Sequence, residues 1–197
     1  MVDKSPSAYG WLVFGLGNPG IEYGLTRHNI GRMVIEYLAT SGFTQKNILS
    51  THKSKCDVGQ VNIGNQKVVI AQSHSYMNLS GQNAKALADF YKVNAANLIV
   101  IHDEIDLPFN SMRIKVGGSD NGHNGLKSMT QHFGPEYYRV RLGVGRPPAP
   151  QDPADFVLRK FTSAEQKQLP DFIIRATSAI ETLIEKGLER VQQDFND

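Results

Sequence analysis

The stretch WLVFGLGNPG, residues 11–20, joins a short apolar run to a turn rich in glycine. An apolar run that ends in glycines predicts a buried strand followed by a tight turn. Gly15, Gly17 and Gly20 also satisfy the pattern G-x-G-x-x-G, which is typical of dinucleotide-binding turns. The glycines therefore either form a nucleotide-binding turn or only allow the backbone to turn tightly.

The residues that follow argue against a dinucleotide site. Such a site needs a helix that opens within the glycine pattern and an acidic residue about 20 residues later, at a strand end. Here Pro19 and Gly20 interrupt the chain, and helical periodicity starts only near Asn29. The acidic residue at the right distance, Glu36, lies inside the predicted helix. We interpret the glycines as a strand-to-loop turn that allows close backbone approach and holds Asn18.

The rest of the chain alternates between strand-like and helix-like segments. Strands are predicted at 11–14, 57–63, 66–72, 98–101, 112–116 and 138–144. Helices are predicted at 29–41 with Gly42 as a stop, from Ser80 as a cap to about Tyr91, at 124–133, and beyond the proline-rich stretch 147–153. This order predicts the α/β class: a single domain over residues 1–197, with a twisted mixed, largely parallel central sheet flanked by helices.

Composition limits the function classes. The 197 residues carry a net charge of +2, which is too small to indicate a nucleic-acid partner by itself. The single cysteine, Cys56, allows no internal disulfide and no cysteine-based zinc site. The polar start does not resemble a signal peptide, and no run of about 18 apolar residues occurs, so we expect no membrane span.

Polar side chains gather where the predicted strands end. Since ligands bind at the carboxyl ends of strands in open α/β sheets, we expect these side chains to converge on one cleft. They are Asn18, His28, Asn29, Asn78, Asp103, His123 and Asn124. Four of them also have a simpler interpretation. Asn29 and Asn124 fit helix N-caps, His28 fits a structural histidine, and Asp103 fits a strand end.

Taken together, the set favours hydrolysis by an activated water. A histidine and an aspartate on separate loops can form an oriented general base, and asparagine amides can donate to a carbonyl or an oxyanion. The sequence has no G-x-S-x-G and no H-E-x-x-H motif, so neither a covalent nucleophile nor a catalytic metal is supported. A small-substrate esterase and a non-catalytic RNA-binding module remain alternatives.

Five segments occur in a familiar order: GLGNPGIEYGLTRHNIG, SYMNLSG, IHDEIDLP, GGSDNGHNGLKSM and YYRVRLGVGRP. Over about residues 11–190 the chain closely resembles the bacterial peptidyl-tRNA hydrolase family. The resemblance implies cleavage of the ester between a peptide and the 3′ ribose of its tRNA, which frees tRNA from chains dropped during translation. It further implies a monomeric, cytoplasmic enzyme without metal or organic cofactor, whose partner is the peptide and acceptor end of peptidyl-tRNA.

The resemblance also assigns residues. It makes His28 the catalytic base and Asp103 its orienting partner. The substrate and oxyanion region would comprise Asn18, which we place with the catalytic pair, and Asn78, Asn124, Tyr23 and Met77. Residues 1–10 would form an N-terminal extension, and 147–155 a lid-like loop leading to the C-terminal helices. One departure from the family is Asn121, which stands where a glycine is common. If this position has a positive φ, asparagine tolerates it better than most residues.

Basic residues concentrate between Arg113 and Arg146, a stretch that contains six basic residues and only two acidic ones. Arg113 and Lys115 are two apart in a predicted strand, as are Arg139 and Arg141, so each pair points to one face. From the sequence alone this could be a solvated sheet edge. The family resemblance favours a tRNA phosphate site, with Lys115 and Arg141 as its contacts.

Overall fold

A seven-stranded sheet forms the centre of the computed structural model, which describes residues 9–40 and 48–197. The strands are β1 (Trp11–Gly15), β2 (Ser50–His52), β3 (Cys56–Ile63), β4 (Gln66–Ser73), β5 (Leu98–Glu104), β6 (Met112–Val116) and β7 (Tyr138–Gly143). Their order is β2-β3-β4-β1-β5-β7-β6. The inner four strands are parallel, and the outer strands pair antiparallel. The predicted mixed, largely parallel sheet is confirmed.

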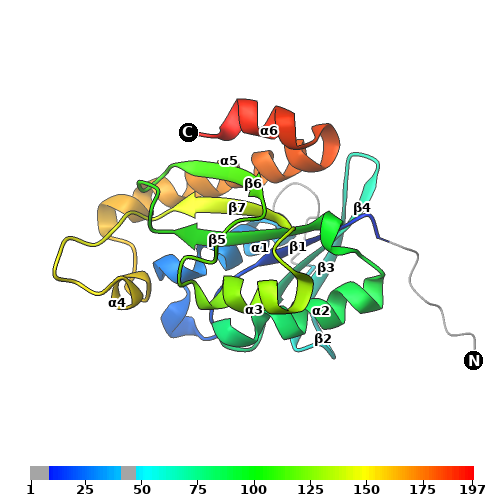
Figure 1. The fold of residues 1–197 in the computed structure, drawn as a ribbon, viewed down its shortest axis with the longest axis horizontal. Helices are drawn as coiled ribbons and strands as arrows, with labels where there is room; N and C mark the ends of the chain where they lie inside the picture. The colour runs from blue at the N-terminus through cyan, green and yellow to red at the C-terminus, as the bar shows by residue number, and fades with distance from the viewer. Residues whose placement is uncertain (1–8, 41–47) are drawn as a thin grey trace, which may run out of the picture.

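Helices cover both faces of this sheet (Figure 1). One core cluster packs the sheet against α1 (Ile30–Thr40), α5 (Ser163–Lys186) and α6 (Leu188–Phe195). A second cluster packs the other face against α2 (Ser80–Tyr91) and α3 (Asn124–Phe133). The short helix α4 (Pro153–Val157) lies beyond the ends of β5 and β7.

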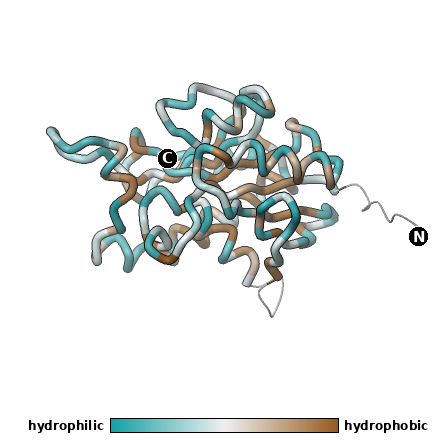
Figure 2. Tube along the Cα trace, turned by 90° about the horizontal axis from the view of Figure 1, so that it is seen from below, coloured by the Kyte–Doolittle hydropathy of each residue, from teal (hydrophilic) through white to brown (hydrophobic). Residues whose placement is uncertain are grey.

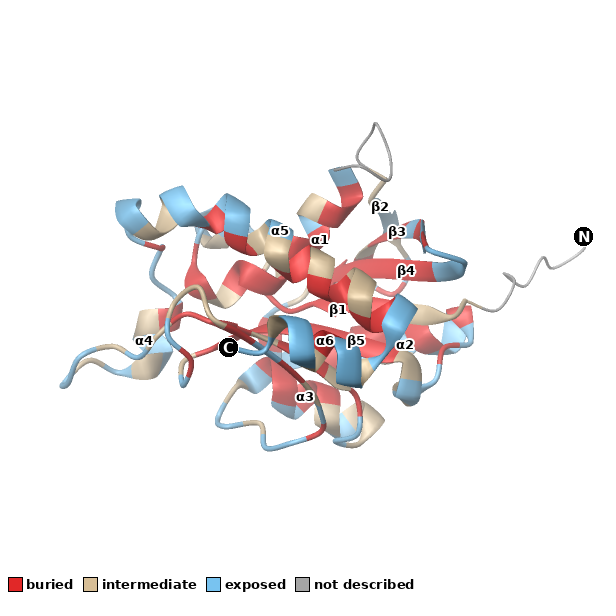
Figure 3. Cartoon of the chain, turned by 90° about the horizontal axis from the view of Figure 1, so that it is seen from above, coloured by how far each residue is buried: buried red, intermediate tan, exposed pale blue. Residues whose placement is uncertain are grey.

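The apolar residues lie at the centre of this layered arrangement. Figure 2 shows hydrophobic segments concentrated in the interior, and Figure 3 shows the central strands buried while the loops around α4 are exposed. Within the described part of the chain, no helix is long and apolar enough to cross a membrane.

The glycines of the first turn let α1 pack directly against the sheet. A Cβ on Gly15 would lie 2.3 Å from the Gly31 carbonyl oxygen, and one on Gly31 would lie 2.4 Å from the Ile101 carbonyl oxygen. Helix α1 begins at Ile30, well beyond the glycine pattern. Gly15 is thus needed for close backbone packing, as the strand-to-loop interpretation predicted.

Several element predictions need correction. Strand β5 runs to Glu104, so Asp103 lies within the strand rather than after it, because its polar residues continue the ladder with β7. Strand β2 was not predicted. Ser80 does not cap α2, because its N–H bonds the Met77 carbonyl and it continues a 3₁₀ turn into the helix. Gly42 and most of the predicted extension lie outside the described residues.

Candidate active site

A cavity of about 810 Å³ opens at the carboxyl ends of β1, β4 and β5. In the sheet, β4 lies on one side of β1 and β5 lies on the other side. The chain that follows β1 leads through α1, β2 and β3 to β4, and it then crosses β1 to reach β5. This change of direction separates the loops after neighbouring strands and leaves room for a ligand. The predicted residues that line the cavity are Asn18, His28, Met77, Asn78, Asp103, His123 and Asn124. Asn29 was expected there too, but it does not line the cavity.

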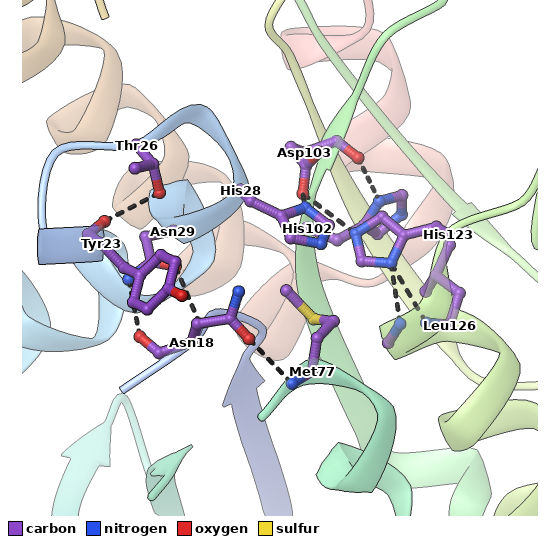
Figure 4. A network of polar contacts seen from close by, with 11 residues as sticks. Asn18, Tyr23, Thr26, His28, Asn29, Met77, His102, Asp103, His123 and Leu126 are labelled. Atoms are coloured by element: carbon purple, nitrogen blue, oxygen red, sulfur yellow. Dashed lines mark hydrogen bonds and ion pairs between the residues drawn. The ribbon is translucent and has the colours of Figure 1, made fainter. Parts of the chain in front are cut away.

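His28 and Asp103 form a hydrogen-bonded pair inside this cavity (Figure 4). His28 lies in the 3₁₀ turn η2 (Arg27–Asn29), and its Nδ1 is 2.9 Å from Asp103 Oδ1. A carboxylate accepts here, so Nδ1 carries the proton and Nε2 remains the basic nitrogen. Burial disfavours the charged ring, but the charge and hydrogen bond of Asp103 outweigh it and raise the pKa of His28.

Asp103 has a second histidine partner that the sequence analysis did not assign. Its Oδ1 also lies 2.9 Å from His123 Nε2. Burial alone would raise the pKa of Asp103, yet His28 and His123 hold it well below its usual range. His123 Nδ1 accepts from the backbone N–H groups of Gly125 and Leu126, so it is the N-cap of α3.

Asn124 is therefore not the helix N-cap that one interpretation suggested. It is the first residue of α3, and its exposed side chain lines the cavity. Imidazole is not among the usual N-caps, so capping preferences would not have identified His123. Asn121 has a positive φ of 46°, a conformation that asparagine tolerates better than most residues.

Asn18 is held in place by three hydrogen bonds. Its backbone N–H donates to Asn29 Oδ1 at 2.8 Å, and its backbone carbonyl accepts from Asn29 Nδ2 at 2.9 Å. Its Oδ1 accepts from the Met77 N–H at 2.9 Å, which leaves the Nδ2 group for another acceptor. In Figure 4 this group points between His28 and Met77. Asn29 thus fixes the turn and does not cap α1.

The remaining cleft residues differ in position. Asn78, in the 3₁₀ turn η3 (Met77–Leu79), is exposed on the cavity wall, whereas Met77 is buried. Tyr23, in the 3₁₀ turn η1 (Ile21–Tyr23), was expected in the cleft together with Met77, but it does not line the cavity. Its carbonyl accepts from Thr26 Oγ1 at 2.8 Å, just before η2.

The basic residues of β6 and β7 share one face, because Arg113 lies opposite Arg141 and Lys115 opposite Arg139. Arg139 is 1% exposed and donates to the carbonyls of Gly118 and Ser119. Arg141 donates through Nε and Nη2 to Glu104 Oε2, at 3.1 and 3.0 Å. Neither Lys115 nor Arg141 lines the cavity. Burial, followed by the nearby Arg141, lowers the pKa of Lys115.

Arg27, which precedes His28, anchors η2 to the C-terminal part of the chain. Its guanidinium donates to the Lys160 carbonyl at 2.9 Å and pairs with Glu165 at 2.8 Å. It also lies over the Phe156 ring of α4, 4.1 Å from the ring centre. Residues 152–154 and 157–158 form the adjacent wall of the cavity.

The ligating atoms of His28, Asp103 and His123 lie within 4.8 Å of one another, close enough to consider a metal ion. The hydrogen bonds favour a different interpretation. A neutral His123 ring that coordinated a metal through Nε2 would carry its proton on Nδ1, where it would face the N–H groups of Gly125 and Leu126. Cys56 is also unsuited to nucleophilic chemistry, because burial raises the pKa of its thiol to about 12.

Fold and site together define a single-domain α/β enzyme with a histidine, a carboxylate and amide groups at the carboxyl edge of its sheet. The sequence model of the peptidyl-tRNA hydrolase family matches residues 12–197. A peptidyl-tRNA hydrolase of Streptomyces avermitilis is 48% identical over 189 residues, which cover 94% of this chain and 93% of that protein. One from Streptomyces coelicolor is 47% identical over 189 residues, which cover 94% of each chain.

A solved structure of the peptidyl-tRNA hydrolase from Acinetobacter baumannii superposes with a TM-score of 0.87 at 34% identity, over 97% of each chain. The chain therefore belongs to the peptidyl-tRNA hydrolase family, and it is a hydrolase that acts on an ester bond.

Proposed function

We propose that this enzyme hydrolyses the ester between the peptide and the 3′ ribose of peptidyl-tRNA, using a water molecule activated by His28. Family membership supports the substrate. The observation that supports the mechanism is the 2.9 Å contact between His28 Nδ1 and Asp103 inside the cavity. A base oriented in this way can act without a covalent intermediate.

In the proposed reaction, water attacks the ester carbonyl carbon while its proton moves to His28 Nε2. The Asp103 carboxylate stabilises the imidazolium that forms. The new C–O bond gives a tetrahedral intermediate, and the Asn18 amide donates to its oxyanion. The C–O bond to the ribose then breaks, and the 3′ oxygen takes the proton back from His28. The products are a free peptide and a tRNA available for reuse.

The other cavity residues would hold the substrate. Asn78 and Asn124 present exposed amides that can bind the peptide backbone or the terminal nucleotide, and Met77 provides an apolar surface beside them. We place Tyr23 at the entrance rather than within the cavity. Asn18→Ala should lower kcat, because its donor acts on developing charge. Asn124→Ala should mainly raise KM, because it binds ground and transition states alike.

Lys115 and Arg141 would contact tRNA phosphates beyond the cavity. Both lie on the basic face of β6 and β7, although Arg141 already pairs with Glu104. We also propose that residues 147–155 act as a lid and that the enzyme works as a cytoplasmic monomer without metal or cofactor. The resemblance to the family is the basis for these points.

The deciding experiment compares N-acetyl-aminoacyl-tRNA with free aminoacyl-tRNA. The proposal predicts release of the acylated amino acid from the first substrate and not from the second. His28→Ala should lower turnover of the first by about 10²–10⁴-fold while the fold is kept. Cleavage of small aryl esters without cleavage of either tRNA would indicate a general esterase. Tight binding of tRNA without cleavage would indicate a binding module.

A further inference from the structure

His123 connects the catalytic pair to the start of α3. Its Nε2 lies 2.9 Å from Asp103 Oδ1, the oxygen that His28 also contacts, and its Nδ1 accepts two N–H groups of α3. We propose that His123 is a positioning residue that holds this shared oxygen and limits how strongly Asp103 retains a proton on His28. The inference rests on the proposed function, in which His28 must be neutral to accept a proton.

The helix N-terminus fixes which nitrogen of His123 carries the proton. The N–H groups of Gly125 and Leu126 reach Nδ1 at 3.1 and 3.3 Å, and a protonated Nδ1 would repel both. The neutral ring therefore carries its proton on Nε2 and donates to Asp103.

Sharing one oxygen changes what Asp103 does to His28. The centres of the two rings lie 4.7 Å apart, and both rings donate to the same carboxylate oxygen, Asp103 Oδ1. A buried carboxylate with His28 as its only partner would favour the protonated imidazole strongly. A second donor takes up part of the oxygen's negative charge. His28 therefore keeps an oriented ring and more easily loses its proton.

The other charged or titratable groups around this cluster do not supply the same effect. His102 on β5 is fully buried, and burial, with His123 next, lowers its pKa to about 3, so it stays neutral. Its Nδ1 donates to the backbone carbonyl of Asp103 and not to the carboxylate. Arg139 on β7 acts on His102 and is bound to backbone carbonyls. Among the described residues, His28 and His123 are the side chains that hydrogen-bond the Asp103 carboxylate.

Two substitutions of His123 test its Nδ1 and Nε2 contacts separately. His123→Asn places an amide oxygen near the Nδ1 position, where asparagine is a favoured N-cap, but it cannot reach Asp103. His123→Gln places an amide N–H near the Nε2 position and loses the cap. His132, in the last turn of α3, bonds the Ser128 carbonyl and provides a control histidine as His132→Asn.

The primary measurement is the pKa of the His28 ring by NMR in the free enzyme, assigned by comparison with His28→Ala. The pKa should rise by roughly 0.5–1 unit in His123→Asn and stay near the wild-type value in His123→Gln and His132→Asn. The acid limb of kcat/KM should move by the same amount. Thermal stability should follow the opposite order, with the larger loss in His123→Gln.

An unchanged or lower His28 pKa in His123→Asn would overturn the inference, and so would equal shifts in both His123 variants. A merely structural His123 would change the melting temperature and leave the titration unaltered. The NMR titration needs no substrate, so it decides this inference even if peptidyl-tRNA is not cleaved. Absence of cleavage by the wild-type enzyme would instead reject the proposed function.

Discussion

Three histidines surround Asp103, and each ring has a different role. His28 shares a charge-assisted hydrogen bond with the carboxylate, His123 donates to the same oxygen, and His102 donates to the backbone carbonyl. The sequence analysis could place His28 and Asp103 in one cavity, because the segments that carry them meet at the carboxyl edge of the sheet. It could not assign His123, because its role depends on the N–H groups of α3 being aimed at its ring.

The His28–Asp103 pair predicts non-additive losses. Asp103→Asn keeps the shape of the side chain but removes the charge that favours imidazolium, and it can invert the ring tautomer. The double variant with His28→Ala should therefore be little slower than His28→Ala alone, since residues that act as a unit are not additive. Steady-state kinetics on N-acetyl-aminoacyl-tRNA test this. Fully multiplicative losses would mean that the two residues act independently.

Because His102 is buried, we expect the free energy of unfolding to fall in mild acid. Its pKa is about 3 in the folded protein, against 6.5 for an ordinary histidine. Between these values the unfolded chain binds the extra proton, so a falling pH favours unfolding. This group's contribution is fully present above about pH 6.5 and declines by about 1.4 kcal/mol for each further unit of pH until the folded pKa is reached.

The test is urea unfolding at pH 7.5 and 5.0 of the wild type and His102→Asn, which keeps a donor but cannot be protonated. The variant should lose less of its free energy of unfolding between the two pH values. His28, whose pKa is raised, contributes in the opposite sense, but it is present in both proteins and cancels in the comparison. Equal losses would show that His102 does not remain neutral in the fold.

Among the elements, α1 depends on the smallest side chains. The sequence predicted the helix and strand around the glycine turn, since periodicity and apolar runs mark them clearly. It could not show that Gly31 lies against β5, because that contact depends on how closely helix and sheet approach. Three-dimensional packing also explains why the sequence analysis ended β5 too early, at residue 101. In the sequence, the polar residues of β5 that line the cavity look like the end of a strand.

Gly31→Ala should destabilise the protein by about 1–3 kcal/mol, because the added methyl group meets backbone that cannot move aside. Its Cβ would lie 2.4 Å from the Ile101 carbonyl oxygen. Gly24→Ala is the matched control, since its φ is −53° and the nearest atom to its Cβ, the Ile21 carbonyl oxygen, is 3.4 Å away. Thermal unfolding of both variants gives the comparison. Equal melting temperatures would show that α1 can shift without cost.

For the whole molecule, we expect the peptide end of the substrate to bind in the cavity and the tRNA phosphates to bind the basic face of β6 and β7. Lys115→Ala and Arg141→Ala should raise KM for full-length tRNA with little change in kcat. Each substitution should also reduce the slope of log affinity against log salt concentration by about 0.7–0.9. The reason is that binding releases fewer counterions when one phosphate contact is lost. A peptide ester of a mononucleotide should be unaffected. Arg141 should show the smaller effect, because Glu104 already offsets its charge.

Lys186→Ala is the control, because Lys186 ends α5 on the opposite side of the sheet. The salt slope should be measured with tRNAs of different sequence, and the losses should be similar because phosphate carries no base information. An unchanged KM and slope in both variants would leave this face as a solvated sheet edge, and the tRNA body would have to bind elsewhere.

Arg27 fastens the segment around α4 to the turn that carries His28. Downstream of α4, the chain is fastened to η2 by the Arg27 contacts with Lys160 and Glu165 and by the bridge between Thr26 and Lys160. Upstream of α4, residues 144–152 form no helix or strand. On its downstream side, the cavity wall at α4 is therefore tied to η2, the turn that carries His28. We therefore expect a movement of α4 that admits a large substrate to break the contact between Arg27 and Phe156 and to bend the chain within residues 144–152. Substitutions that stiffen residues 144–152 should slow substrate entry and leave His28 in place.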